Sequence, residues 1–183
     1  MASTVPQPGD VIAVRTTGRA AGLIRFGAAL RELLTGTTAP DLDNHIAVVH
    51  HKDKAGTLWC VEGRPGGVGW RDAKAYLASP YTVSNVLQPK TADQRKLVCA
   101  GALALIGTPY DWEGIAADAA ADLDLSALWH PAFGAEVPGH VVCSSLAEWL
   151  YLKAHLACPK QEGAREIQPA DWTAFMLANH YSA

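Results

Sequence analysis

The pattern of apolar and polar residues predicts a small β-sheet in the first half of the chain. Short apolar runs are bounded there by Gly, Pro, Asp and Asn residues, as β-strands commonly are. Two of these runs are joined by the polar loop 51–56, which predicts an antiparallel hairpin. Strands are expected at residues 11–14, 45–50, 57–62 and 81–87, with a short strand or bulge at residues 66–70.

Apolar residues at helical spacing predominate in the remaining segments. Thr91 is a suitable N-cap, and the sequence Gly107-Thr108-Pro109 should end the helix that it begins. Helices are expected at residues 19–34, 91–106, 113–129, 143–155 and 169–178, with a helical turn at residues 71–77 and a loop at residues 131–139. The predicted fold class is α+β, in which a small antiparallel sheet packs against helices.

Length and composition favour one domain over residues 1–183. An apolar content of 49% is enough for a substantial core, and 183 residues leave no room for a second catalytic domain. Residues 1–8 are interpreted as an N-terminal arm. Residues 113–140 are interpreted as a helical and loop insertion before the helix that begins at Cys143.

Charge and hydropathy argue against nucleic-acid and membrane-spanning roles. The formal net charge is −3, and the Lys and Arg residues are scattered, so no basic stripe faces a phosphate backbone. No apolar run approaches the roughly 18 to 20 residues that a membrane span needs. The first residues also lack the features of a secretory signal. We therefore expect a protein that is cytoplasmic or delivered without a signal peptide.

The cysteine and histidine spacings predict neither a metal site nor a cofactor. The four cysteines form no C-x-x-C pair, and without an export signal they are expected to be free thiols. His50, His51 and His140 provide no helical i, i+4 pair and no supporting carboxylate pattern. His50 and His51 are therefore interpreted as surface residues of the hairpin.

Cys143 and His45 stand where a nucleophile and its base could be presented from rigid elements. Cys143 begins a predicted helix, and the positive end of a helix favours a thiolate. The backbone N–H groups of the first turn, including that of Ser144, are candidate donors to an oxyanion. His45 begins a predicted strand, and an imidazole beside Cys143 would complete a thiolate–imidazolium pair.

Glu62 is the candidate third residue because the base needs a partner for its second ring nitrogen. It ends the strand that pairs with the His45 strand. Alternation places Glu62 with Cys60 on one face, and His45 with Ala47 on one face of the neighbouring strand. The hypothesis assumes that both faces point toward the helix of Cys143.

Two motifs resemble those of a known family. Residues 107–112, Gly-Thr-Pro-Tyr-Asp-Trp, and residues 143–146, Cys-Ser-Ser-Leu, resemble the G-x-P-Y … C-S-x-L pattern of NlpC-type papain-like cysteine peptidases and amidases. In the usual members the histidine strand follows the cysteine helix, whereas here residues 44–49 come first. That order is similar to the circularly permuted branch, which includes YiiX-like proteins and the lecithin retinol acyltransferase group. Residues 9–12, 61–63 and 67–69 also fit this branch.

The resemblance implies a circularly permuted papain-like fold and a covalent mechanism. In it Cys143 is the nucleophile, His45 the base and Glu62 the orienting residue, while Tyr110 lines the site. The acyltransferases carry Asn-Cys-Glu around the nucleophile, but this chain has Val-Cys-Ser at residues 142–144, which favours an amide hydrolase. The substrate implied is a bacterial cell-wall peptide, and family habit suggests a bacteriophage lysis or tail apparatus, hence a virion-associated location.

Two alternatives stay open at the level of sequence. A lipid thioesterase or acyltransferase would use the same Cys–His pair beside an apolar groove walled by Leu23, Ile24 and Phe26. A non-enzymatic module would contact protein partners in a larger assembly, with its triad out of register.

In the hydrolase, Trp70 and Trp112 are the further candidates for a substrate groove because they flank the proposed site in the sequence.

Overall fold

The predicted strands form one antiparallel sheet. The computed structural model describes residues 5–16, 44–77, 81–82, 88–111, 141–159 and 169–180. Within them the strands are β1 (Val11–Val14), β2 (His45–Lys52), β3 (Leu58–Arg64), β4 (Gly67–Asp72) and β5 (Tyr81–Thr82). Their order across the sheet is β4-β3-β2-β1-β5, and every neighbouring pair is antiparallel. The β2–β3 hairpin and the α+β class are confirmed.

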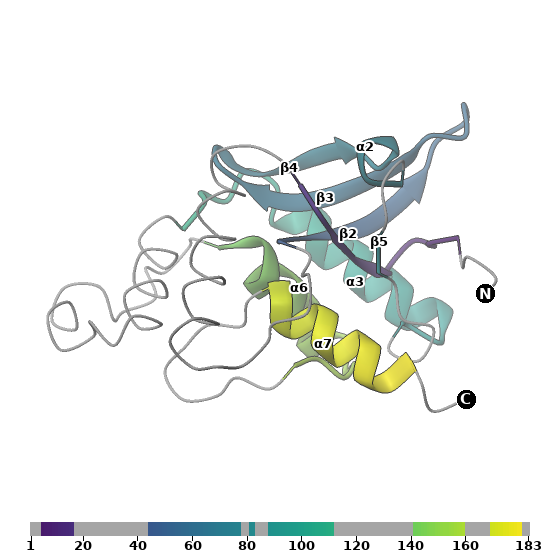
Figure 1. Ribbon diagram of the computed structural model, residues 1–183. Helices are drawn as coiled ribbons and strands as arrows, with labels where there is room; N and C mark the ends of the chain where they lie inside the picture. The colour runs from purple at the N-terminus through teal and green to yellow at the C-terminus, as the bar shows by residue number, and fades with distance from the viewer. Residues whose placement is uncertain are drawn as a thin grey trace, which may run out of the picture.

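The two faces of the sheet are covered by different helices. Figure 1 shows α3 (Ala92–Ala104), α6 (Cys143–Lys153) and α7 (Pro169–His180) on one side of the sheet, and the short α2 (Lys74–Leu77) on the other. The larger apolar core lies on the side of the three long helices and includes Ile46, Val48 and Val61 of the sheet. A smaller core lies on the side of α2 and includes Ala47, Val49 and Cys60. The central strands are therefore buried on both faces.

Element boundaries follow local hydrogen bonding. Thr91 caps α3 as predicted, because its hydroxyl accepts from the Gln94 N–H at 3.1 Å and the Gln94 side chain accepts from the Thr91 N–H at 3.2 Å. The segment predicted as a short strand or bulge at residues 66–70 is the strand β4, which pairs with β3 along its whole length. The helical turn predicted at residues 71–77 begins only at Lys74, because Arg71 and Asp72 still belong to that ladder.

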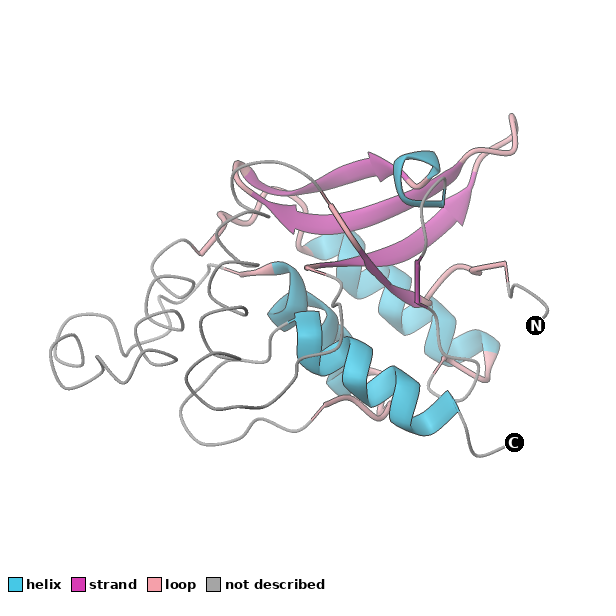
Figure 2. Cartoon of the chain, in the orientation of Figure 1, coloured by secondary structure: helices cyan, strands magenta, loops and turns pink. Residues whose placement is uncertain are grey.

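The helices that bear on the site are confirmed with small differences at their ends, as Figure 2 shows for α3, α6 and α7. The predicted helices 19–34 and 113–129, the loop 131–139 and most of the strand 81–87 lie outside the described residues.

Candidate active site

Cys143 is held at the start of α6 by a close contact with β3. It is the first residue of the helix, and its side chain is buried. A Cβ atom placed on Gly63 would lie 3.3 Å from the backbone nitrogen of Cys143 and 3.3 Å from the carbonyl carbon of Val142. Glycine at this position therefore lets the strand and the helix start approach each other. The Ser145 hydroxyl accepts from the Val142 N–H at 3.0 Å and so fixes the first turn.

His45 connects Cys143 with Glu62. The imidazole is buried, and its Nε2 lies 2.9 Å from Oε2 of Glu62. Because Nε2 bonds the carboxylate, Nδ1 is the ring nitrogen left to interact with Cys143, whose effect on the pKa of His45 shows that the two groups are close. The structure therefore brings together the three residues that the sequence nominated for catalysis.

The charge of the imidazole follows from these neighbours. Burial alone would lower the pKa of His45, but the negative charge and hydrogen bond of Cys143, followed by those of Glu62, raise it to about 9. The imidazolium form thus predominates at neutral pH when Cys143 is a thiolate. This arrangement can hold a thiolate–imidazolium pair, which is the reactive form of a cysteine nucleophile.

Glu62 is ionised although it is almost fully buried. Burial would raise the pKa of this carboxyl, but hydrogen bonds from His45 and Tyr76 and the charge of Arg64 lower it. The Tyr76 hydroxyl donates to Oε2, and the Arg64 guanidinium contacts Oε1. Sequence reasoning missed both groups. Arg64 had a usable signal, since it is two residues from Glu62 and therefore shares its face of β3.

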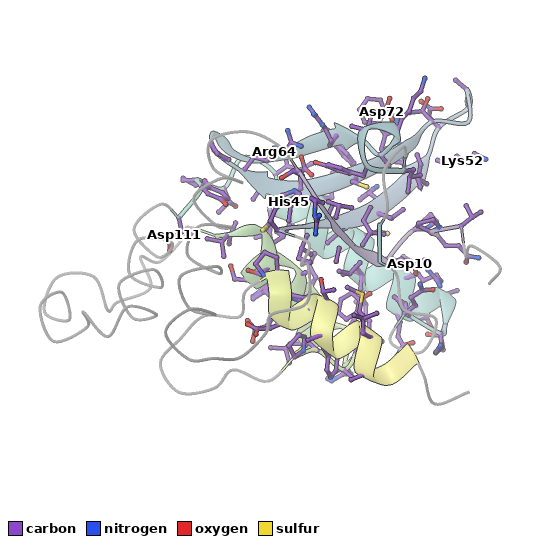
Figure 3. All side chains as sticks on the ribbon, in the orientation of Figure 1. Asp10, His45, Lys52, Arg64, Asp72 and Asp111 are labelled. Atoms are coloured by element: carbon purple, nitrogen blue, oxygen red, sulfur yellow. The ribbon has the colours of Figure 1, made fainter. Side chains whose placement is uncertain are left out.

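The sequence analysis assumed that the His45 face of β2 and the Glu62 face of β3 point toward the helix of Cys143. That assumption is wrong. His45 and Glu62 lie on the face covered by α2, where the ring of His45 is 5.9 Å from that of Tyr76, and not on the face covered by α6. His45 and Cys143 still meet because each is the first residue of its element. In Figure 3, Arg64, His45 and Asp111 lie toward one end of the sheet, and Lys52 and Asp72 toward the other.

Tyr110 reaches the site through a loop attached to β4. The Val68 N–H donates to the Thr108 carbonyl at 2.8 Å, and Tyr110 pairs with Val141 in an isolated parallel bridge two residues before Cys143. Burial is the main cause that raises the pKa of Tyr110, followed by the negative charges of Cys143, Asp111 and Glu62. The phenol therefore stays protonated beside the thiol and can donate a hydrogen bond there.

The remaining residues that the sequence predicted for the site include one at the start of α6 and one that lies away from His45. Ser144 is buried in the first turn of α6, where its carbonyl accepts from the indole N–H of Trp172 at 3.3 Å. Trp70 is not brought to His45, because its ring packs against His50 at 4.8 Å and His51 at 5.4 Å, further along β2. Trp112, Leu23, Ile24, Phe26 and His140 lie outside the described residues.

The part of the chain that the structure describes has neither a metal-binding cluster nor a membrane-spanning helix. The described residues contain no group of three or more His, Cys, Asp and Glu side chains placed to bind a metal ion. No helix among them has the length and apolarity needed to cross a bilayer.

The fold and the site together define an α+β protein with a buried Cys–His–Glu cluster at one end of its sheet. Comparisons with protein-family models, with curated proteins and with solved structures found no match. The chemistry of the cluster must therefore be argued from its own geometry.

Proposed function

We propose that this protein is a cysteine hydrolase that cleaves an amide bond, with Cys143 as nucleophile, His45 as base and Glu62 as the residue that orients the base. The observation that carries the proposal is the position of His45, whose imidazole is hydrogen-bonded to Glu62 and interacts electrostatically with Cys143 at a helix start. A cysteine buried only for packing needs neither a charged histidine nor an ionised carboxylate beside it.

The proposed reaction begins with attack of the Cys143 thiolate on the amide carbonyl carbon. The developing oxyanion would receive hydrogen bonds from backbone N–H groups of the first turn of α6, including that of Ser144, and from the Tyr110 phenol. His45 then gives its proton to the leaving nitrogen as the C–N bond breaks, which yields an amine and a thioester. Water, deprotonated by the now neutral His45, hydrolyses the thioester, releases a carboxylic acid and regenerates the thiol.

The finer assignment rests on the sequence resemblance. The proposed fold is a papain-like fold of NlpC type in which circular permutation places the histidine strand before the cysteine helix. The proposed substrate is a bacterial cell-wall peptide, and a bacteriophage tail or lysis apparatus is the proposed setting. The contacts among Cys143, His45 and Glu62 support an enzyme over a purely structural module. In a structural module we expected these three residues to be out of register.

Alkylation rates of the individual cysteines test the nucleophile. Cys143 is 2% exposed, whereas Cys99 and Cys158 are partly exposed, so accessibility alone predicts that Cys143 reacts most slowly with iodoacetamide. We expect the reverse order near pH 6.5, because only Cys143 lies beside an imidazolium. Peptide mass spectrometry after timed quenching gives the three rates. If Cys143 reacts no faster than Cys99 and Cys158, the proposed nucleophile is wrong.

The reaction class needs a separate measurement. Purified peptidoglycan fragments incubated with the protein should release new primary amines, and mass spectrometry should locate the hydrolysed amide. The Cys143→Ala variant should abolish the release, and Cys158→Ala is the matched control that should retain it. Equal amine release by Cys143→Ala would contradict the mechanism. Turnover of a chromogenic fatty-acyl thioester without any release from peptidoglycan fragments would favour the lipid-directed alternative.

A further inference from the structure

Glu62 is held from two sides by groups that do not touch the nucleophile. We propose that Arg64 and Tyr76 are positioning residues, which fix the Glu62 carboxylate so that its Oε2 stays turned toward His45. This inference rests on the proposed function, because it assigns roles within the same site. Neither residue is expected to contact the substrate carbonyl, so both act through Glu62.

The three side chains form a closed ring of contacts. The Arg64 Nε contacts Oε1 of Glu62, the Arg64 Nη2 donates to the Tyr76 hydroxyl, and that hydroxyl donates to Oε2. Oε2 therefore has hydrogen bonds to Tyr76 and His45, whereas Oε1 has the ionic contact with Arg64. A carboxylate bound only to His45 could rotate about its terminal torsion, which is broad and roughly two-fold. The ring removes that freedom and leaves Oε2 at 2.9 Å from the imidazole.

The ring also compensates the negative charge of Glu62, which is buried away from water. The Glu62 side chain is 1% exposed, and a buried carboxylate without compensating partners is strongly disfavoured. Arg64 is 35% exposed and so connects the cluster to solvent. The order of groups from the surface inward is the Arg64 cation, the Glu62 carboxylate, the His45 imidazole and the Cys143 thiol, which the proposed mechanism uses as a thiolate. Glu62 thus lies between two cations, Arg64 and the His45 imidazolium.

Other titratable groups near this chain of charges remain neutral. Burial, followed by the charge of Glu62, raises the pKa of Tyr76 above its ordinary value. Burial, followed by the charges of Glu62 and Asp72, raises the pKa of the Cys60 thiol to about 12. Tyr110, whose pKa is also raised, faces Glu62 from the loop after α3 and lies near Asp111. Within the described residues, Arg64 is therefore the cation besides His45 that acts on Glu62.

Loss of the contacts among Arg64, Tyr76 and Glu62 should lower the fraction of His45 that is protonated. A Glu62 carboxylate that has lost Arg64 takes up a proton more easily, because burial favours its neutral form. A neutral or rotated carboxyl group no longer stabilises the imidazolium, so thiolate formation loses its partner charge. Alkylation of Cys143 near pH 6.5 should then be slower than in the wild type.

The experiment is the pH profile of iodoacetamide labelling at Cys143 in the full chain. Arg64→Met should raise the half-maximal pH by about one unit, which corresponds to roughly tenfold slower labelling on the acid side. Tyr76→Phe should raise it by less, because Arg64 remains, and Arg64→Lys should restore part of the loss by returning a positive charge. Two variants serve as matched controls and should leave the profile unchanged. They are Arg71→Met, at an exposed arginine of β4, and Tyr151→Phe, at a buried tyrosine whose hydroxyl accepts from the Val11 N–H.

The possible results separate this inference from the proposed function. A wild-type Cys143 that labels no faster than Cys99 and Cys158 overturns both. A fast wild-type Cys143 with an unchanged profile in both Arg64→Met and Tyr76→Phe overturns the positioning roles and leaves the nucleophile in place. Far-UV circular dichroism verifies folding. If Arg64→Met does not fold, Tyr76→Phe and Arg64→Lys decide, and wild-type profiles in these two overturn the inference.

Discussion

The contact between β3 and the start of α6 gives a sharp prediction for Gly63→Ala. The added methyl group would lie 3.3 Å from the backbone nitrogen of Cys143, whereas carbon atoms pack best at about 3.5–4.0 Å from their neighbours. The atoms that it meets belong to backbone, so they cannot turn aside as a side chain could. The start of α6 must therefore move away from the strand by a few tenths of an ångström.

The size of the effect follows from that displacement. A misplacement of about 1 Å in a catalytic group can cost about a hundredfold in rate, so a few tenths of an ångström should cost about three- to tenfold. Stability should change little. Overpacking costs about 1 kcal/mol or more, while Gly→Ala lowers the entropy of the unfolded chain by an amount that returns about 0.4–1 kcal/mol. The variant should thus be folded but less reactive.

The assay is again the labelling rate of Cys143 near pH 6.5, together with urea denaturation. Gly69→Ala is the matched control, since a Cβ at that position on the neighbouring strand would meet no atom within 4 Å. It should be as stable as the wild type or slightly more stable, with unchanged labelling. If folded Gly63→Ala labels as fast as Gly69→Ala, the contact does not position Cys143, and the geometric argument fails.

Two further predictions concern a buried ion pair outside the cluster and the charge of His45. Arg95→Met should destabilise the fold by about 3 kcal/mol in urea denaturation at pH 7, because it leaves the fully buried Asp10 without the guanidinium that now lies 2.7 Å away. Since burial already raises the pKa of Asp10, the loss should shrink toward pH 4, and a loss that does not depend on pH would contradict this origin. The second prediction compares Cys143 labelling by negatively charged iodoacetate with labelling by neutral iodoacetamide. The imidazolium of His45 attracts the anion, so the rate ratio should be high at neutral pH and fall as the pH rises through about 9; a ratio as flat as that of Cys158 would show that His45 carries no such charge.

Local sequence signals predicted the elements that carry the site. The hairpin that bears His45 and Glu62 follows from two apolar runs around a polar loop, and both signals act over a few residues. The start of α3 follows from the reciprocal hydrogen bonds of Thr91 and Gln94, which are also local. The start of α6 at Cys143 is also fixed locally, because the Ser145 hydroxyl accepts from the Val142 N–H. These parts needed no knowledge of tertiary packing.

The side of the sheet on which His45 lies could not be predicted in the same way. Alternation assigns residues to two faces, but both faces of β2 are apolar, with Ile46 and Val48 on one and Ala47 and Val49 on the other. The pattern therefore does not say which face the long helices cover. Tyr76 was missed for a related reason, since its contact with Glu62 depends on where α2 packs after β4. Both errors concern the arrangement of elements that are correct individually.

Adjacent residues of β3 explain how the site can form from elements that are far apart in the sequence. Successive side chains of a strand point to opposite faces, so Glu62 points toward α2 while Gly63 faces α6. Glu62 fixes the imidazole of His45 on one face, and the missing side chain of Gly63 admits the backbone of Cys143 on the other. One strand end therefore positions both members of the proposed catalytic pair. The order of the histidine strand and the cysteine helix along the chain does not enter this geometry, which is why the pair can be built with the histidine first.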